Sequence, residues 1–492
     1  MKNTIYSHFH HWAVKQPYAP AVIEEHRTLT YDDLEARSAQ VAEALADLHQ
    51  KRVGIVMEHG FDQIAAIIGV LRSGNAYVPA EPFLPQQRID YYMNSAGVAT
   101  IIDKAFMQRL KSTPADPMPD RSQPDGEAYI LYPSGTSGKP KGIIVENSSV
   151  VNYAQAFENE MHTSPADVML QLSVCSFDIF VEEVFASLLN GFRRDPCAGA
   201  SLLNGAAIAV PAPATASGCT EEIIDFCNRK GVTEISGFPY LLAEMNKLDM
   251  VPRRLRLLIS GGDVLRYSYI DRLGKHYIPL YNTYGPSETT VCATYARVDN
   301  AEPLSDGTLP IGRPVYGVEV MLLDSHLQPV KPGEKGEICI LGRGVARGYV
   351  GNPPESRNFT HLPDGRRVYR SGDEGYLLPD GQLAFTHRLD DQVMIMGKRV
   401  EPAEVENVLN SAPGVERGVV RSFRDAKGLS YLVAYFVPKK AAGGVGRIKA
   451  WLNARLSDFM VPDIFVQLKK IPLTRRGKVD VAALPKISEH GN

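Results

Sequence analysis

The sequence has little cysteine and no long apolar segment. Only six of its 492 residues are cysteines, without a C-x-x-C pair or a spacing typical of zinc sites. We therefore expect reduced, mostly buried thiols rather than the disulfides of a secreted fold. No apolar run approaches the roughly 20 residues that span a bilayer, and the N-terminus lacks the apolar centre of a secretion signal. These absences predict a cytoplasmic protein with no membrane partner.

The sequence also lacks an excess of either charge. Its formal net charge of −3 gives no electrostatic reason to expect nucleic acid as a partner. The hydrophobic content of 44% and the charged content of 22% are those of an ordinary globular protein. With 492 residues, the chain exceeds what one hydrophobic core supports, so we expect at least two domains.

Helix and strand patterns alternate along the first part of the chain. Apolar spacing predicts a helix from Asp32 or Asp33 to Leu48 and another over 61–73. Such alternation with buried-strand patterns predicts α/β layers with substantially parallel sheets. The strand patterns lie at 52–57, 76–79, 168–172, 206–210, 232–235 and 255–259.

The character of the sequence changes near residue 315. Short strand patterns with turns at 317–323, 336–341 and 383–386 predict a small β-rich subdomain. Helix patterns at 402–411 and 447–456, with a strand pattern at 433–437, predict a small α+β unit that begins near residue 389. The predicted fold class is therefore α/β, with a large N-terminal domain of layered sheets and helices and a small C-terminal domain.

One loop predicts phosphate binding. Residues 132–142 read YPSGTSGKPKG and connect strand-like residues 128–131 to a strand pattern at 143–145. Backbone N–H groups and hydroxyls of such a loop can surround phosphates while a lysine neutralises their charge. The loop is not a G-x-x-x-x-G-K-[ST] motif, which excludes the usual NTPase assignment. A flexible Gly/Ser linker is the alternative at this point.

Further loops of unusual composition also carry polar groups. Residues 259–263 (ISGGD) and 281–290 (YNTYGPSETT) follow apolar strands, where ligands bind in α/β sheets. Residues 369–373 (YRSGD) place a carboxylate on a turn, which suits vicinal hydroxyls, and residues 472–480 carry a lysine. Each segment alone also fits a tight turn, a charged hinge or a solvated basic patch.

In this order and spacing, the segments resemble the adenylate-forming superfamily, specifically the amino-acid adenylation domains of nonribosomal peptide synthetases. The resemblance covers essentially the whole chain and includes residues 29–31, 71–79 and 342–349. It implies an N-terminal adenylation core over 1–388 that binds substrate and ATP, and a mobile C-terminal domain over 391–492 with the catalytic lysine. Asp390 matches the hinge between them.

The resemblance implies a two-step reaction that uses ATP and Mg²⁺. The carboxylate of an amino acid attacks the α-phosphorus of ATP, which releases pyrophosphate and gives an aminoacyl adenylate. The acyl group then passes to the phosphopantetheine thiol of a carrier protein. Positioning and charge stabilisation dominate the first step.

The motif matches imply a role for each nucleotide-binding residue. Ser287 matches the α-phosphate contact, Glu288 the Mg²⁺ ligand, and Lys478 the catalytic lysine beside the reacting phosphorus. Asn282 and Tyr284 match the adenine contacts. The β- and γ-phosphates fall to Ser134, Gly135, Thr136, Ser137, Gly138 and Lys141, and the rest of the nucleotide falls to Gly261, Gly262, Asp263, Asn282, Thr283, Tyr284 and, at the ribose, Asp373 and Arg388.

The sequence departs from the family pattern at several positions. None of the changes removes an adenylation residue, but the loss of two cations after the hinge leaves the details of thiol transfer open. Pro133 replaces a usual Thr or Ser, His387 a Gly, Arg476 a common Asn, and Met394 and Met396 the usual Lys and Arg.

The resemblance also places an amino-acid pocket. Asp178 falls where an aspartate normally holds the α-ammonium group of the substrate. An unpaired carboxylate such as Glu182 is costly in a deep pocket, and a cationic side chain would offset that cost. The set resembles pockets for lysine and, less closely, ornithine. Besides Asp178, the pocket positions are Ile179, Glu182, Ser236, Ile259, Gly261, Thr283, Val291 and Cys292.

The predicted substrate and partners have alternatives. If Glu182 instead pairs with a protein cation or faces water, a neutral polar amino acid fits Ser236 and Thr283. Because no carrier motif or condensation domain flanks the matched segments, we expect a stand-alone enzyme that loads a separate carrier protein. An acyl- or aryl-CoA ligase using free coenzyme A is the alternative enzyme, although simple acids have no ammonium group for Asp178. A catalytically silent nucleotide-binding or scaffold protein is the third possibility.

Overall fold

The computed structural model describes residues 2–110, 118–133, 139–189, 205–216, 218–425, 429–439, 444–473, 479–485 and 487. The chain separates into two compact units. The first comprises Met1–Pro82, Tyr92–Tyr132 and Gly142–Leu389, and the second comprises Phe83–Tyr91, Pro133–Lys141 and Asp390–Asn492.

The largest sheet of the first unit has nine strands. The strands from β12 to β1 run parallel, and β14, β13 and β2 add antiparallel edges. β10 and β11 begin two residues after their predicted patterns, since a turn from Pro252 to Leu255 precedes β11. In order, the strands are β14 (Arg313–Pro314), β13 (Thr294–Arg297), β12 (Leu280–Tyr284), β11 (Leu257–Ser260), β10 (Glu234–Gly237), β8 (Val168–Leu170), β9 (Ala207–Ala209), β1 (Pro20–Ile23) and β2 (Thr28–Thr30).

A second sheet of the first unit has six strands. Its strands β6, β4, β3 and β5 run parallel, while β7 pairs antiparallel with β6. Residues 132–142 therefore form the connection of the β6–β7 hairpin. In order, the strands are β17 (Gly348–Tyr349), β7 (Ile143–Glu146), β6 (Glu127–Leu131), β4 (Ala76–Ala80), β3 (Arg52–Val56) and β5 (Thr100–Asp103).

The predicted β-rich part is an antiparallel sheet of the first unit. β19 (Arg367–Leu377) pairs with β16 (Gly336–Gly342), β18 (Phe359–His361) and β20 (Leu383–Arg388), and β16 pairs with β15 (Val318–Leu323). In the second unit, β21 (Val393–Ile395) pairs with β22 (Lys398–Val400), and β24 (Ser430–Pro438) lies between β23 (Val415–Arg424) and β25 (Ile464–Gln467). Helices α11 (Pro402–Asn410) and α12 (Val445–Asn453) complete it. The α+β prediction is confirmed.

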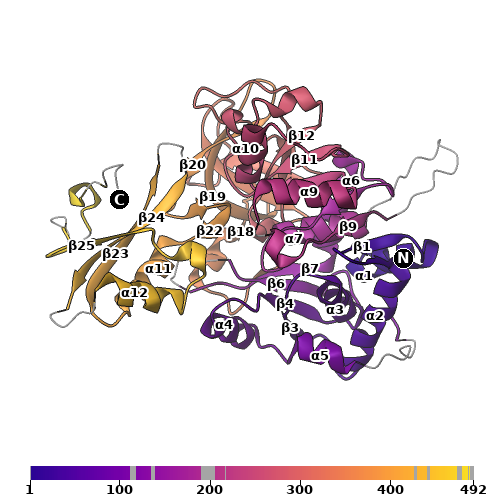
Figure 1. The fold of residues 1–492 in the computed structure, drawn as a ribbon. Helices are drawn as coiled ribbons and strands as arrows, with labels where there is room; N and C mark the ends of the chain where they lie inside the picture. Colours follow the sequence, from indigo (N-terminus) through magenta and orange to yellow (C-terminus); the bar gives the residue numbers. More distant parts are fainter. Residues whose placement is uncertain are drawn as a thin grey trace. The chain divides into compact units, whose positions relative to one another are not determined.

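Helices α1 (Ile5–Lys15), α2 (Tyr31–Ala44) and α3 (Phe61–Arg72) pack together (Figure 1). Asp33 and Thr30 form a capping box at the start of α2, as the acidic start predicts. The helix ends four residues before the expected Leu48, where the chain tightens into short turns. The other helices are α4 (Gln86–Ala96), α5 (Lys104–Arg109), α6 (Asn147–Met161), α7 (Asp178–Val181), α8 (Pro213–Ala216), α9 (Thr220–Lys230) and α10 (Pro239–Leu248). Within the described ranges, none of them has both the length and the apolar composition to cross a membrane.

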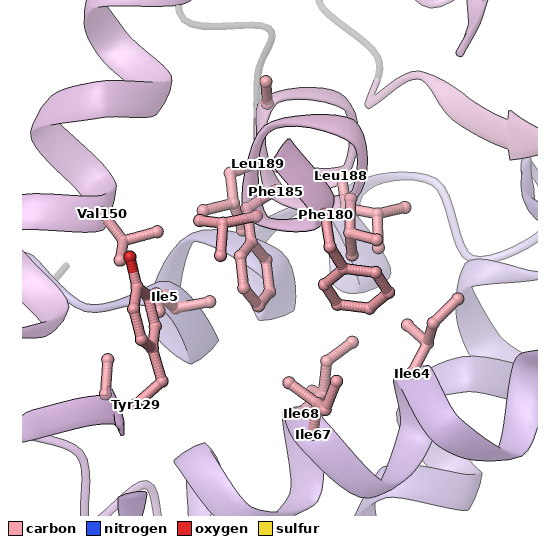
Figure 2. Close-up of a cluster of buried hydrophobic side chains, with 14 of the residues drawn as sticks. Ile5, Ile64, Ile67, Ile68, Tyr129, Val150, Phe180, Phe185, Leu188 and Leu189 are labelled. Carbon is pink, nitrogen blue, oxygen red and sulfur yellow. The ribbon is translucent and has the colours of Figure 1, made fainter. Parts of the chain in front are cut away.

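The core of the first unit supports the segment around α7. Helix α3 is buried over nearly its whole length and is mostly apolar, as a core helix should be, and its Ile64, Ile67 and Ile68 face Phe180 and Phe185 (Figure 2). The two phenylalanines belong to α7 and to the π-helical turn η1 (Glu182–Ala186) that follows it. Buried aromatic rings thus anchor the segment that carries two predicted pocket acids.

We expect Phe180→Ala to destabilise the first unit. The side chain is fully buried, and removing such a ring leaves a cavity that costs about 3–5 kcal/mol. Urea unfolding of the full chain should show the transition of this unit at lower denaturant. Val14→Ala, at a residue that is 67% exposed, should change the free energy of unfolding by less than about 0.5 kcal/mol. Equal effects of the two substitutions would contradict the anchoring role.

Candidate active site

The predicted pocket residues meet at the carboxyl ends of parallel strands in the first unit. Ser236, Ile259 and Thr283 lie near the ends of β10, β11 and β12, and all three are buried. In an open α/β sheet, the carboxyl ends of the strands are the ligand-binding edge. Gly261 follows β11, and a Cβ there would meet the Thr283 hydroxyl at 2.6 Å, so glycine keeps the strand ends close.

Asp178 begins α7 at this edge. Its carboxylate accepts a 2.5 Å hydrogen bond from the hydroxyl of Ser287. Burial raises the pKa of Asp178 to about 6, with a further contribution from the charge of Glu288. Among the described residues no lysine or arginine pairs with Asp178, and a desolvated carboxylate of this kind is an attractive partner for an ammonium group.

Glu182 stands one helical turn further and is 2% exposed. The hydroxyl of Tyr153 donates a hydrogen bond to it, and Ser236 forms another. Burial raises its pKa above the ordinary value, and the charge of Asp178 adds to this. In the part of the chain that the structure describes, no lysine or arginine forms an ion pair with Glu182. The alternative that a protein cation neutralises it therefore finds no support there.

Glu183, the neighbour of Glu182 in the π-helical turn, has a different set of partners. The carboxylate of Glu183 accepts hydrogen bonds from the backbone N–H groups of Leu172 and Ser173 and from Gln171 Nε2. Burial raises the pKa of Glu183 to about 8. Glu183 thus fixes the loop after β8, whereas Glu182 contacts the pocket hydroxyls. Turns of this type occur frequently at functional sites.

Thr290 and Val291 form a strained segment at two consecutive residues, next to the predicted pocket position Cys292. Thr290 and Val291 have φ values of 61° and 70°, a region that β-branched residues rarely adopt. The hydroxyl of Thr290 donates to the carbonyl of Gly344 at 2.7 Å, which holds this conformation. Close packing adds to it, since a Cβ on Gly285 would meet Cys292 Cα at 2.6 Å. Such strain at a predicted pocket residue is typical of binding sites.

The predicted ribose residues are directly bonded. The guanidinium of Arg388 donates to Asp373 Oδ1 at 2.8 Å, and the hydroxyl of Tyr284 donates to Asp373 Oδ2 at 2.7 Å. Asp373 and Arg388 are opposite each other on β19 and β20. The arrangement joins the proposed adenine and ribose contacts into one group.

The other predicted nucleotide residues make internal hydrogen bonds. Asn282 is buried and its amide donates to the carbonyl of Pro310 at 2.8 Å. Asp263 accepts from the hydroxyl of Tyr240, and Gly262 has the positive φ of 81° that this turn requires. The side chain of Ile179 is buried in α7 beside Asp178.

Glu288 fits a magnesium ligand. Its carboxylate is buried and accepts a 2.6 Å hydrogen bond from the hydroxyl of Tyr349. Mg²⁺ in nucleotide sites is held by one or two carboxylates together with phosphates and water. The described residues hold no cluster of three or more His, Cys, Asp or Glu side chains arranged for a metal.

Some predicted residues cannot be placed in this site. Lys478 and the phosphate-loop residues Ser134, Gly135, Thr136, Ser137 and Gly138 lie outside the described residues. Lys141 is buried and belongs to the second unit. Asp390 is the first residue of that unit's C-terminal part, and its carboxylate accepts from the backbone N–H of Gln392 at 3.2 Å. Their roles stay predictions.

Three tyrosines of the site were not predicted from the sequence. Tyr153, Tyr349 and Tyr295 are buried, and Tyr153 and Tyr349 bond directly to predicted functional acids. Tyr153 lies on α6 and Tyr295 on β13, both in apolar patterns that indicate core. A tyrosine rather than a phenylalanine at such a position was the only signal, since a buried hydroxyl usually needs a partner.

Comparison with known proteins identifies the family. Residues 9–194 and 195–350 match the AMP-binding enzyme family, and residues 404–478 match the AMP-binding enzyme C-terminal domain. Bacitracin synthase 2 from Bacillus licheniformis is 32% identical over 97% of this chain and 18% of its own length. The chain thus spans less than a fifth of that relative.

Solved structures give the same result for the fold. PA1221, a nonribosomal peptide synthetase protein containing adenylation and PCP domains, has a TM-score of 0.82 and 25% identity, covering 98% of this chain and 84% of that one. The o-succinylbenzoate CoA synthetase from Bacillus subtilis has a TM-score of 0.83 at 22% identity, covering 97% of each chain, and shares the fold.

The fold and the two matched family models place this chain among the adenylate-forming, AMP-binding enzymes. The chain belongs to the AMP-binding enzyme family. The predicted family and the α/β fold with a large N-terminal and a smaller C-terminal domain are confirmed.

The pKa of Asp178 predicts how amino-acid affinity depends on pH. Burial raises this pKa to about 6, so the carboxyl is protonated below pH 6 and no longer attracts an ammonium group. In a Glu182→Gln background, where this second carboxyl no longer titrates, the dissociation constant of norleucine, which has no side-chain amine, should rise as pH falls through 6, by about tenfold per pH unit well below it. Titration calorimetry of the full chain between pH 5 and 8 measures this. Asp178→Asn in the same background should bind weakly without this pH dependence, and an unchanged profile in that variant would contradict the assignment.

Proposed function

We propose that the chain activates L-lysine, or a similar basic diamino acid, as its adenylate. An oxygen of the amino-acid carboxylate bonds to the α-phosphorus of ATP, and the bond from that phosphorus to the bridging oxygen breaks. Aminoacyl-AMP and pyrophosphate are the products. Rate enhancement in such a step comes from alignment and from charge stabilisation.

The buried carboxylate of Glu182 carries the substrate proposal. It has hydroxyl partners but no protein cation in the described residues. Leaving such a group charged and unpaired costs several kcal/mol, which a side-chain ammonium group offsets. Asp178 takes the α-ammonium group, and the apolar side chains of Ile259 and Val291 contact the methylenes between the two charges.

The nucleotide residues then divide the work. Asp373, with Arg388, binds the ribose hydroxyls, and Tyr284 and Asn282 border the adenine. Ser287 contacts the α-phosphate, and Glu288 binds the Mg²⁺ that neutralises phosphate charge. Lys478 stabilises the charge that develops at the reacting phosphorus, while the phosphate loop and Lys141 hold the leaving pyrophosphate.

The second half-reaction is transfer to a carrier protein. The thiol of a phosphopantetheine arm attacks the acyl carbon and AMP leaves. Rotation of a C-terminal domain over 391–492 about Asp390, relative to a core over 1–388, exchanges the two half-reactions. The likeness to PA1221, which contains adenylation and PCP domains, supports a carrier, and we propose a separate one.

A neutral polar amino acid is the second candidate substrate. The raised pKa of Glu182 favours it, because a protonated carboxyl donates a hydrogen bond and needs no cation. Transfer to free coenzyme A is disfavoured by Asp178, since the substrates of such ligases need not carry an ammonium group. The fold shared with a CoA synthetase does not decide this point.

Pyrophosphate exchange into ATP tests the proposal. The wild-type chain should exchange labelled pyrophosphate in the presence of lysine or ornithine and not with aliphatic amino acids. Strong exchange with serine or glutamine and none with lysine would favour the neutral substrate. Strong exchange with leucine or valine alone would overturn both.

Glu182→Gln should lower kcat/KM for lysine by about 2–3 kcal/mol of transition-state stabilisation, as for a lost charge-assisted contact. Exchange with glutamine should fall less or rise. The matched control is Glu183→Gln, because Glu183 is the adjacent buried acid and bonds to the β8 loop instead. It should leave the ratio of lysine to glutamine activity unchanged. A ratio that moves equally in both variants would remove the role of Glu182.

A further inference from the structure

The end of the pocket around Glu182 contains two tyrosines that the predicted pocket set lacks. Tyr153 comes from α6 and Tyr295 from β13, and they are 3% and 8% exposed. The hydroxyl of Tyr153 donates to Glu182 Oε2. Cys292 and Glu182 lie close to both tyrosines, and all four side chains are buried.

The carboxylate of Glu182 is held but not saturated. Tyr153 and Ser236 each supply one hydroxyl, whereas an ionised carboxylate has about four acceptor sites. The groups that face it are Asp178 from α7, Cys292 before β13, and the hydroxyls of Tyr153, Ser236 and Tyr295. All are neutral or acidic, so the remaining acceptor sites suit a donor of positive charge.

The hydroxyl of Tyr295 lacks a hydrogen-bond partner of normal geometry among the described residues. It is buried, and the hydroxyl of Tyr153 lies beside it. Buried hydroxyls in folded proteins nearly always have a partner. A bound ligand with a further N–H donor would supply the missing one.

We propose that Tyr153 is a positioning residue that fixes the carboxylate of Glu182 for a primary ammonium group, and that the Tyr295 oxygen accepts a second N–H of that group. This inference rests on the proposed function. A primary ammonium has three N–H donors, and Glu182 and Tyr295 take two of them on different sides. The side-chain amine is then recognised by direction as well as by charge.

A core role for both tyrosines predicts a different outcome. In that case Tyr→Phe lowers stability and affects all substrates alike. A positioning role acts only through Glu182 and therefore affects the KM for lysine more than kcat. Losing the hydrogen bond from Tyr153 also removes a contribution that lowers the pKa of Glu182, so the acid limb for lysine moves to higher pH.

The experiment is pyrophosphate exchange by the full chain carrying Tyr153→Phe, Tyr295→Phe or the control Tyr77→Phe. Tyr77 is also fully buried with an unbonded hydroxyl, but it lies in β4. We expect Tyr153→Phe to raise the KM for lysine about three- to tenfold and to shift the acid limb upward. Tyr295→Phe should raise this KM without the shift, and Tyr77→Phe should change neither. Thermal melting checks that each variant is folded.

A double-mutant cycle tests whether Tyr153 changes the KM for lysine through Glu182. If Tyr153 acts through Glu182, Tyr153→Phe should have little effect on residual lysine activity in a Glu182→Gln background. Equal effects in both backgrounds, or an unshifted pH profile, would overturn the positioning role of Tyr153. An unchanged KM in Tyr295→Phe would overturn the second contact. Absence of lysine-dependent exchange by the wild-type chain would instead overturn the proposed function. The two failures are distinguishable because only the second affects the wild-type chain.

Discussion

The site depends on keeping two carboxylates, those of Asp178 and Glu182, away from water within one short helical segment. Burial raises the pKa of each, and the charge of Asp178 further raises that of Glu182. A segment with two such acids is unfavourable alone. The segment keeps its position because Phe180 and Phe185 pack on the mostly apolar helix α3. This packing offsets the free-energy cost of burying the two acids. The two carboxylates can therefore pair with positive charges of a ligand.

One kind of hydrogen bond recurs around the site: a neutral hydroxyl group donates to a buried carboxylate. Ser287 donates to Asp178, Tyr153 to Glu182, and Tyr349 to Glu288. A neutral donor fixes the direction of a carboxylate. Asp178 and Glu182, which pair with no lysine or arginine among the described residues, thereby keep their charge for a cationic ligand. Asp373 differs, since Arg388 pairs with it. This matches the proposed roles, in which the first three face cationic partners, ammonium or metal, and Asp373 binds neutral hydroxyls.

The sequence predicts the fold well because its signals are local. Apolar runs for β3 and β4 and the acidic start of α2 act over a few residues, so the elements lie close to their expected places. The pocket acids were found from the resemblance. The tyrosines were not, because Tyr153 reaches Glu182 across 29 positions and its α6 pattern looks like core. The π-helical turn from Glu182 to Ala186 was missed as well, since its residues have no spacing that distinguishes it from an α-helix.

The spacing of the two acids bears on which substrates are accepted. The backbone N–H of Glu182 bonds to the carbonyl of Asp178, so the two lie one turn apart, about 6 Å along the axis, and on one face. A chain with an amine at each end satisfies both, whereas a monoamino acid leaves Glu182 unpaired at a cost of several kcal/mol. One methylene in an apolar pocket changes specificity by only about 10–200-fold. The site should therefore discriminate more strongly against substrates that lack a second amine than against substrates that differ by one methylene. Lysine and ornithine should accordingly inhibit the activation of each other more strongly than any neutral amino acid does.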